Sequence, residues 1–271
     1  MNERKWDARI ARARELAVRY PFAAEGLAFY ERMTRLQESL YADLASQIGA
    51  VRVQRLSGTL QNDFQLSILG PKFAPFLAGI AEIAPGVLAD AARGLCAEGR
   101  DIHCELLTKF WRADWDAPGS IPPVRALLAR IFLQPYAEYL ADITEPLAIS
   151  ATPPRCPLCD CPPQVGVLRP EGDGAKRSLI CSLCAHEWEF RRIVCTGCGE
   201  EDPHKLAVYS AQELSHVRVE ACDSCRGYIN TIDLTKDGRA VPIVDELAAI
   251  PLNLWATEHG YTHSQTNLLG I

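Results

Sequence analysis

Cys156-Pro-Leu-Cys159 opens a stretch of about seventy residues that contains four CxxC motifs in succession. The other three motifs are Cys181/Cys184, Cys195/Cys198 and Cys222/Cys225. Two cysteines at this spacing turn both sulfurs toward one ion, and two such motifs complete a tetrahedral shell of four thiolates. The sequence therefore predicts two closed metal sites, with these eight cysteines as the ligands.

A hairpin pattern lies between the first and second motifs and again between the third and fourth. Residues 164–169 and 176–180 flank a Gly-rich turn, and residues 206–210 and 217–221 flank a polar turn. Because a hairpin brings its ends together, each pattern would bring its two flanking motifs to one ion. Trp188 and Tyr228 follow the second motif of each copy, so the segment is an internal repeat with a period of about forty residues.

The connection between the copies supports the same pairing. Residues 185–194 contain no turn residue, and alternate positions from Trp188 to Val194 have the parity of a strand. Ten extended residues span roughly 30 Å, which is too far for Cys184 and Cys195 to share an ion. We therefore pair the first motif with the second and the third with the fourth.

The identity of the metal is open at this point, because zinc and mononuclear iron both accept four thiolates. The Cys-Pro-x-Cys form occurs in rubredoxin knuckles and in zinc ribbons alike. No motif supplies a ligand other than cysteine, so we expect no open catalytic position. His186 and Cys161 are spare donors near the first site, and we interpret them as a solvated histidine and a small buried thiol.

The sequence divides near residue 150, where residues 149–154 end in Pro-Pro and form the expected linker. Before it, apolar periodicity predicts helices over residues 6–20, 24–45, 75–98, 102–111 and 124–141, and residues 58–71 are expected to form a loop. Arg9 and Arg12 lie off the apolar face of the first helix, so we expect them to be solvated. The predicted fold class is α+β, with an all-α domain (residues 1–150) followed by two tandem modules (151–190 and 191–271).

Charge and composition limit the function classes. Residues 151–271 carry 11 Lys and Arg against 16 Asp and Glu, and bound thiolates add more negative charge, so nucleic-acid binding is not expected. The sequence contains no run of eighteen apolar residues, so we expect no membrane-spanning helix. The N-terminus lacks the apolar region of a signal peptide, so we expect no secretory signal. An odd total of 11 cysteines with CxxC spacing favours a reducing compartment, and hence the cytoplasm.

Four segments resemble one known family. They are Cys156-Pro-Leu-Cys-x-x-x-Pro163, Cys181-Ser-Leu-Cys-Ala-His-Glu-Trp188, Arg191-Arg-Ile-Val-Cys-Thr-Gly-Cys-Gly199 and Glu220-Ala-Cys-Asp-Ser-Cys-Arg-Gly-Tyr228. Together with the tail (Asp245-Glu-Leu-Ala248, Glu258-His-Gly-Tyr261 and Asn267), they look like the FdhE family of formate dehydrogenase accessory proteins. The match covers residues 156–271; before that only the architecture agrees. The chain departs from the family pattern at Asn230, where a lysine is usual, and at Asn253, where an acidic residue is expected.

The resemblance implies a cytoplasmic assembly factor, acting as a chaperone for formate dehydrogenase and binding its catalytic subunit. It further implies two rubredoxin-like modules, each holding a mononuclear metal ion, with iron favoured and zinc possible. The eight CxxC cysteines are the ligands by this resemblance, and neither an enzymatic activity nor a small-molecule substrate is implied. Acidic residues after the hairpins are expected to steer a basic partner surface; they are Glu200, Glu201, Asp202, Asp245 and Glu246.

Another class of function stays open. A closed shell of four thiolates also suits a rubredoxin-like electron carrier, and a CxxC motif suits a thiol redox protein. A carrier has no evident use for about 150 attached helical residues. A thiol oxidoreductase is normally accompanied by a thioredoxin-like βαβ pattern, which this sequence lacks.

Overall fold

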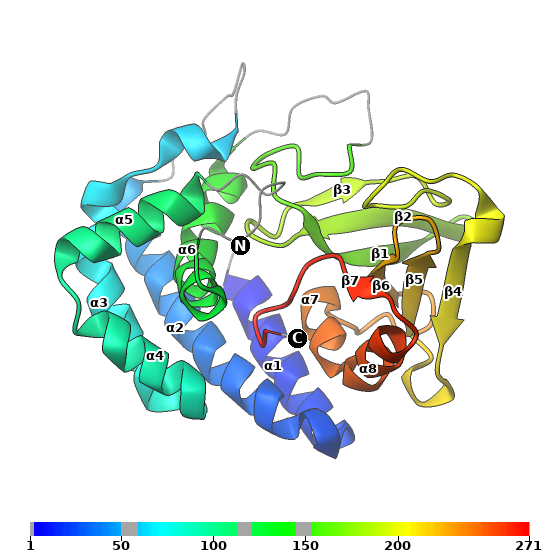
Figure 1. Ribbon diagram of the computed structural model, residues 1–271, viewed down its shortest axis with the longest axis horizontal. Helices are drawn as coiled ribbons and strands as arrows, with labels where there is room; N and C mark the ends of the chain where they lie inside the picture. Colours follow the sequence, from blue (N-terminus) through cyan, green and yellow to red (C-terminus); the bar gives the residue numbers. More distant parts are fainter. Residues whose placement is uncertain (1–2, 50–58, 113–120, 145–152, 271) are drawn as a thin grey trace.

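The computed structural model of the chain describes residues 3–49, 59–112, 121–144 and 153–270. Figure 1 shows helices on one side, a β-sheet on the other, and two C-terminal helices packed against the sheet. We call residues 3–144 the helical half and residues 153–270 the sheet half. The order confirms the coarse α+β prediction, whereas the predicted linker at 149–154 lies largely outside the described residues.

The described helices of the first half differ from the prediction at two places. They are α1 (Glu3–Arg19), α2 (Ala24–Ile48), α3 (Leu66–Ile83), α4 (Gly86–Cys96), α5 (Arg100–Trp111) and α6 (Pro123–Ile143). The single helix predicted over 75–98 is wrong, because Ala84 is extended before Pro85 and separates α3 from α4. The predicted loop over 58–71 is wrong from Leu66 onward. Leu69 and Phe73, on either side of Pro71, are fully buried, and this burial outweighs the hydrogen bond that Pro71 cannot donate.

Among the described residues, α3 is long and apolar enough to cross a membrane, with a mean hydropathy of 1.3 over 18 residues. Length and composition alone also select the core helices of globular proteins. Leu69, Phe73, Leu77 and Ile80 of α3 form one fully buried stripe. These four residues belong to the hydrophobic core.

Two arginines of α1 are buried, so the prediction that they are solvated is wrong. Arg9 donates two hydrogen bonds to Glu138 of α6, at 2.8 and 3.0 Å. Arg12 donates to Asp245, at the end of α7 (Pro242–Asp245), at 2.6 Å. Periodicity within one helix gives no sign of carboxylates that lie 129 and 233 residues away. These ion pairs fix α1 to α6 and to the sheet half.

The sheet half contains both predicted hairpins. Its strands are β1 (Pro163–Glu171), β2 (Gly174–Cys181), β3 (Glu187–Glu189), β4 (Leu206–Ser210), β5 (Val217–Cys222), β6 (Gly227–Asp233) and β7 (Thr262–His263). β1 pairs with β2 and β4 pairs with β5, both antiparallel. The strand expected across residues 185–194 is confined to β3, although Phe190 and Val194 are buried.

The two repeats join in one continuous sheet, which the sequence did not predict. The strand order is β3-β2-β1-β6-β5-β4, with β1 and β6 parallel and β7 added beside β6. Gly166 of β1 lies opposite Thr231 of β6, and a Cβ atom at Gly166 would clash with the Thr231 hydroxyl. Glycine is therefore required where the two repeats meet.

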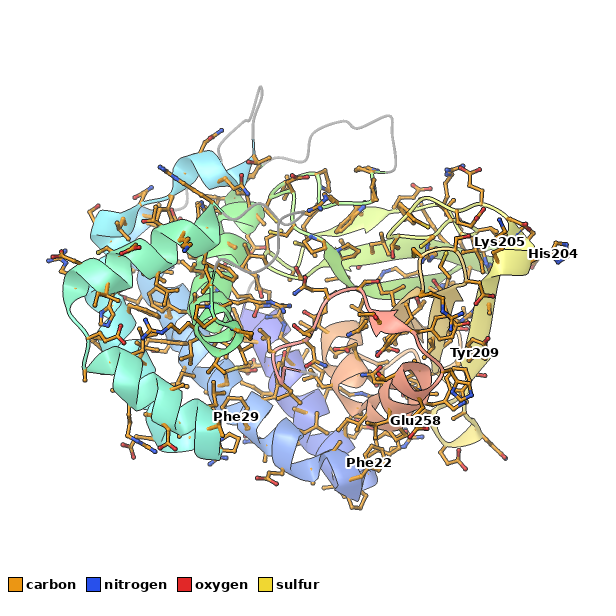
Figure 2. All side chains as sticks on the ribbon, viewed as in Figure 1. Phe22, Phe29, His204, Lys205, Tyr209 and Glu258 are labelled. Atoms are coloured by element: carbon orange, nitrogen blue, oxygen red, sulfur yellow. The ribbon has the colours of Figure 1, made fainter. Side chains whose placement is uncertain are left out.

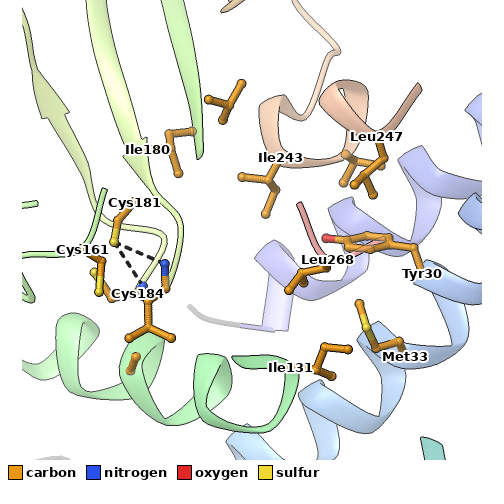
Figure 3. Packing of buried hydrophobic residues seen from close by; sticks show 14 of the residues in the cluster. Tyr30, Met33, Ile131, Cys161, Ile180, Cys181, Cys184, Ile243, Leu247 and Leu268 are labelled. Carbon is orange, nitrogen blue, oxygen red and sulfur yellow. Dashed lines mark hydrogen bonds between the residues drawn. The ribbon is translucent and has the colours of Figure 1, made fainter. Parts of the chain in front are cut away.

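The buried residues of the two halves form a single core. α7 packs against α1, β1 and β6, and α8 (Ile250–Glu258) packs against β5. Figure 3 shows Cys181 and Cys184 beside the same packed interior as Ile131, Met33 and Leu247. The first pair of motifs is thus enclosed partly by residues of the helical half.

Candidate metal centres

The first and second motifs meet in a buried cluster, which we call the first centre. The Sγ–Sγ distances are 3.5 Å from Cys156 to Cys184, 3.3 Å from Cys159 to Cys181 and 3.6 Å from Cys159 to Cys184. All four cysteines are buried. The turn from β1 into β2 brings Cys181 back to the motif that precedes β1, as a hairpin does.

The third and fourth motifs form the second centre, which is open to solvent. The Sγ–Sγ distance is 3.7 Å from Cys195 to Cys225 and 3.7 Å from Cys198 to Cys222. Cys198 and Cys225 are exposed, and only Cys222 is buried. The two copies of the repeat thus differ in how far solvent and other molecules reach their sulfurs.

Both centres have the dimensions of a tetrahedral thiolate shell. A metal–sulfur distance of about 2.3 Å gives sulfur–sulfur edges of about 3.8 Å. The separations of 3.3–3.7 Å fall slightly below this value. In each centre all four sulfurs lie within 4.8 Å of one another. The donor set therefore fits one ion per centre, and the geometry alone suits zinc and iron equally.

The backbone repeats one unusual conformation at every motif. The residue directly after the second cysteine has a positive φ: 59° at Asp160, 53° at Ala185, 77° at Gly199 and 58° at Arg226. For residues other than glycine this conformation costs about 1–2 kcal/mol. Within the motifs, backbone N–H groups point at sulfur, as from Leu183 N to Cys181 Sγ at 3.3 Å and from Gly197 N to Cys195 Sγ at 3.3 Å. Such donors stabilise negative charge on the sulfurs.

Protonation of the first centre is governed by its burial. Burial raises the pKa of Cys156, Cys159 and Cys184 well above the ordinary value. At Cys181 burial acts in the same direction, but hydrogen bonds from the surrounding thiols lower the pKa well below that value. Binding of a cation would require all four thiolates, so loading would release protons and depend on pH.

Arg130 of α6 is a buried cation beside the first centre, and no sequence motif indicated it. Its guanidinium donates to the carbonyl of Ser182, inside the second motif, at 3.0 and 3.2 Å. It also donates to Thr266 O and to Gln164 Oε1, the latter at 2.8 Å. Burial lowers the pKa of Arg130 to about 10, so the side chain remains charged at neutral pH. The helical half thus supplies a positive charge next to sulfurs that are negative when metal is bound.

Glu246 is a buried carboxylate that shares a polar network with this arginine. It accepts hydrogen bonds from Asn267 Nδ2 at 3.1 Å, Gln164 Nε2 at 3.3 Å and Asn230 Nδ2 at 3.4 Å. Glu246 and Asp245 are both completely buried. The expectation that these two residues steer a partner is therefore wrong, because they lie in the interior; Glu200, Glu201 and Asp202 remain at least partly exposed.

We expect Glu246 to make stability fall as pH rises. Burial raises its pKa to about 7, against 4.5 for the free side chain, so the folded state binds the proton more tightly than the unfolded state. Between these two values each rise in pH weakens folding, and from pH 5 to 7.5 the loss is about 2 kcal/mol. Urea unfolding should show this slope in the wild type and a smaller one in Glu246→Gln. Equal slopes would contradict the assignment.

A third cluster of possible ligands is occupied by an arginine. His216, Asp237 and Asp245 place their donor atoms within 4.8 Å of one another. Arg12 donates to Asp237 at 2.8 Å and to Asp245 at 2.6 Å, and His216 Nε2 lies 2.8 Å from Asp245. The positive charge that these carboxylates need is thus supplied by the protein. This cluster is an ion-pair network between α1 and the sheet half.

Four further residues singled out from the sequence have clear positions. Cys161 is a buried thiol beside the first centre, with its Sγ 3.6 Å from Cys159 O. His186 is half-buried and stacks on Trp188, so the expectation of a solvated histidine is only partly met. The two departures from the family pattern are in contact: Asn230 Nδ2 donates to Asn253 Oδ1 at 2.7 Å. The family pattern expected from the resemblance has a lysine and an acidic residue at these two positions, which would form a charged pair. This chain has a neutral pair there.

Comparison with known proteins finds two family domains in the sheet half. Residues 155–192 match the family model "FdhE, central domain", and residues 193–269 match "FdhE, C-terminal domain". A protein FdhE homolog of Aquifex aeolicus is 37% identical over 117 residues, which are 42% of this chain and 41% of that protein. One from Pseudomonas aeruginosa is 40% identical over 121 residues, or 42% and 38% of the two chains. The matched part thus spans about two fifths of the length of these curated relatives.

The fold agrees over nearly the whole chain. A crystal structure of the FdhE protein from Pseudomonas aeruginosa superposes with a TM-score of 0.72 and 24% sequence identity. The superposition covers 97% of this chain and 94% of that one, so it includes the helical half, which lies outside the two matched domains. By these sequence matches residues 155–269 belong to the FdhE family, and the superposition shows that the remainder of the chain shares the fold of an FdhE protein.

Proposed function

We propose that the chain is a non-enzymatic accessory protein that binds the catalytic subunit of formate dehydrogenase during its maturation in the cytoplasm. Its sheet half consists of two rubredoxin-like modules. Each module holds one mononuclear metal ion, iron in preference to zinc, and the ion stabilises the module. The proposed domains are residues 1–150, 151–190 and 191–271. The observation that carries the proposal is the pair of four-cysteine centres within the family's central and C-terminal domains.

The chemistry of the centres supports a scaffold over a catalyst. Four cysteines per ion complete a tetrahedral shell and leave no position for a substrate. The bound ion would lock the ends of each hairpin together, and in small modules this contributes a large part of the folding free energy. In the first centre, Arg130 would compensate the charge of the thiolates.

The proposal is tested in a strain that lacks this protein. Formate dehydrogenase polypeptide should be made in that strain, but little of it should be active. The purified protein should capture the catalytic subunit without oxidising formate. Capture should weaken as salt rises, because exposed acidic groups such as Glu201 would attract a basic partner surface. Normal enzyme activity in the deletion strain would refute the accessory role.

The alternative is a redox function, and the solvent exposure of the second centre favours it. Exposed Cys198 and Cys225 would allow electron or thiol exchange with another protein. An absorption spectrum of protein purified without oxygen identifies the metal, since a ferric tetrathiolate is coloured and zinc is not. Zinc in both centres would exclude the carrier, because zinc is not redox-active. Reversible one-electron reduction of a purified iron-containing protein would favour the carrier.

A further inference from the structure

The two edges of the sheet are built differently. At one edge, β3 has only three residues, and Glu187 and Glu189 form ion pairs with Arg169 and Lys176. At the other edge, β4 has the sequence Leu-Ala-Val-Tyr-Ser and carries no charge, and its central Val208 is 55% exposed. Proteins normally protect an edge strand by charged residues or by shortening it. β3 has both forms of protection, and β4 has neither.

A cleft of about 320 Å³ lies along the same edge, on the open face of the sheet. Val208 and Ile193 line it, and each is 55% exposed. Two of its arginines are paired: Arg177 lies 2.6 Å from Glu220, and Arg218 lies 2.6 Å from Asp233. A third, Arg192, donates to the carbonyl of Ala175, and cysteines of the second centre line another part of the cleft. Val208 and Ile193 therefore offer an apolar side chain a contact surface at the strand edge.

The opposite face of β4 is aromatic. Tyr209 packs on Trp255 of α8 with ring centroids 4.4 Å apart, and Trp255 stacks on His259 at 4.1 Å. Figure 2 shows Tyr209 at the outer edge of the molecule, near Glu258 and below Lys205. In a strand added beside β4, alternate side chains would therefore contact the cleft and this aromatic face.

The segment that contains β4 is acidic, since residues 193–271 carry 11 Asp and Glu against 5 Lys and Arg. Exposed Glu213 lies in the turn after the strand, and exposed Glu258 lies one helical turn after Trp255, which packs on Tyr209. Glu201 before the strand is paired with Arg191, and Lys236 donates to Ser215 O beside the turn. The cation at the start of the strand, Lys205, is paired with Glu200 at 3.3 Å. A second copy of this chain would bring the same acidic groups, on a chain of formal net charge −6, to the opposite side of the interface. This repulsion disfavours self-pairing and favours a basic partner.

We propose that the free edge of β4 is a docking site at which an extended segment of a partner protein adds as one more strand. The segment presents an apolar side chain to the cleft and carries Lys or Arg at its ends. Backbone hydrogen bonds supply the affinity, and the cleft and the acidic rim supply the selectivity. The inference rests on the proposed function, because that function makes a protein the occupant of the edge. It deepens the function by naming the surface that the partner would use.

The direct test uses a defined peptide and the metal-loaded full-length protein. The probe is a labelled ten-residue peptide of alternating Val and Thr with two Lys at each end; its counterpart has Glu at the ends. The Lys peptide should bind at least about tenfold more tightly than the Glu peptide, and Val208→Lys should weaken binding at least about tenfold. Val87→Lys is the matched control, because Val87 is 77% exposed on α4, on the opposite side of the molecule from β4 (Figure 1).

Hydrogen exchange locates the peptide. The amides of residues 206–210 should be protected on binding, and those of residues 187–189 should not. Equal binding by wild type and Val208→Lys, protection elsewhere, or failure of the Lys peptide to bind would overturn the inference. A wild-type dimer that Val208→Lys dissociates would also overturn it, since a second copy would then occupy the edge.

Capture of the formate dehydrogenase catalytic subunit separates this inference from the function on which it rests. If the Lys peptide binds β4 but wild type does not capture the subunit, the docking site stands and the proposed function fails. If wild type and Val208→Lys capture the subunit equally well, the proposed function stands and the docking site fails.

Discussion

Replacing Cys159 with alanine is expected to leave one bound ion per chain instead of two and to lower the free energy of unfolding by more than about 5 kcal/mol. Cys159 is 1% exposed and lies in the core shared by both halves. A change of this size approaches the whole stability of a typical domain. Cys198→Ala should also leave one ion, but with a smaller loss of stability, because the second centre is at the surface.

Cys161→Ala is the matched control for this prediction. Cys161 is also 1% exposed and lies two residues from Cys159, but it is not among the four sulfurs of the first centre. Its replacement should keep two ions per chain and cost about 1 kcal/mol, as the loss of a small buried group does. Elemental analysis and urea unfolding measure both effects. If Cys159→Ala and Cys161→Ala lowered stability equally, loss of packing would explain the result and metal ligation would not.

The second large effect is expected at Arg130. Arg130→Met keeps most of the apolar volume but removes every donor to Ser182 O, Thr266 O and Gln164 Oε1. Buried acceptors without a donor, together with the loss of a buried charge, typically cost about 3–5 kcal/mol. The ion of the first centre should also be released to a chelator faster, because the compensating charge is gone.

Arg125→Met on the same helix is the control for Arg130→Met. Arg125 pairs with Glu98, and its side chain is 39% exposed, so solvent screens the pair and its loss should cost less than about 1 kcal/mol. Chelator-release kinetics should be unchanged in Arg125→Met. If Arg130→Met and Arg125→Met were equally stable and released the ion of the first centre at the same rate, Arg130 would not support that centre.

The local parts of the structure could be predicted because their signals are local. A CxxC spacing or a strand–turn–strand pattern is complete within a few residues, so both hairpins can be recognised from the amino-acid sequence alone. The parallel pairing of β1 with β6 has no such signal, because it joins Gly166 to Thr231 across the whole repeat. A glycine inside a strand of apolar residues was the one local indication of close approach at that point.

Buried charge was the main source of error for the same physical reason. The sequence of α1 presents Arg9 and Arg12 as a polar face, and a polar face is normally solvated. Their carboxylate partners, Glu138 and Asp245, belong to other elements. Asp245 and Glu246 were misread in the same way, as surface acids. Arg130 could not be recognised as important until Ser182 O and Gln164 were placed around it.

The Arg12–Asp245 pair has a consequence for synthesis on the ribosome. The two residues are 233 positions apart, so at about 5–20 residues per second Arg12 waits roughly 12–47 s for its partner to be translated. During that time the nascent helical half would hold Arg12 with Glu15 of its own helix as a partner, but without Asp237 and Asp245, which enclose it in the folded protein. The N-terminal helices therefore cannot reach their final packing ahead of the rest, and a chain that stops before Asp245 should remain open to proteolysis.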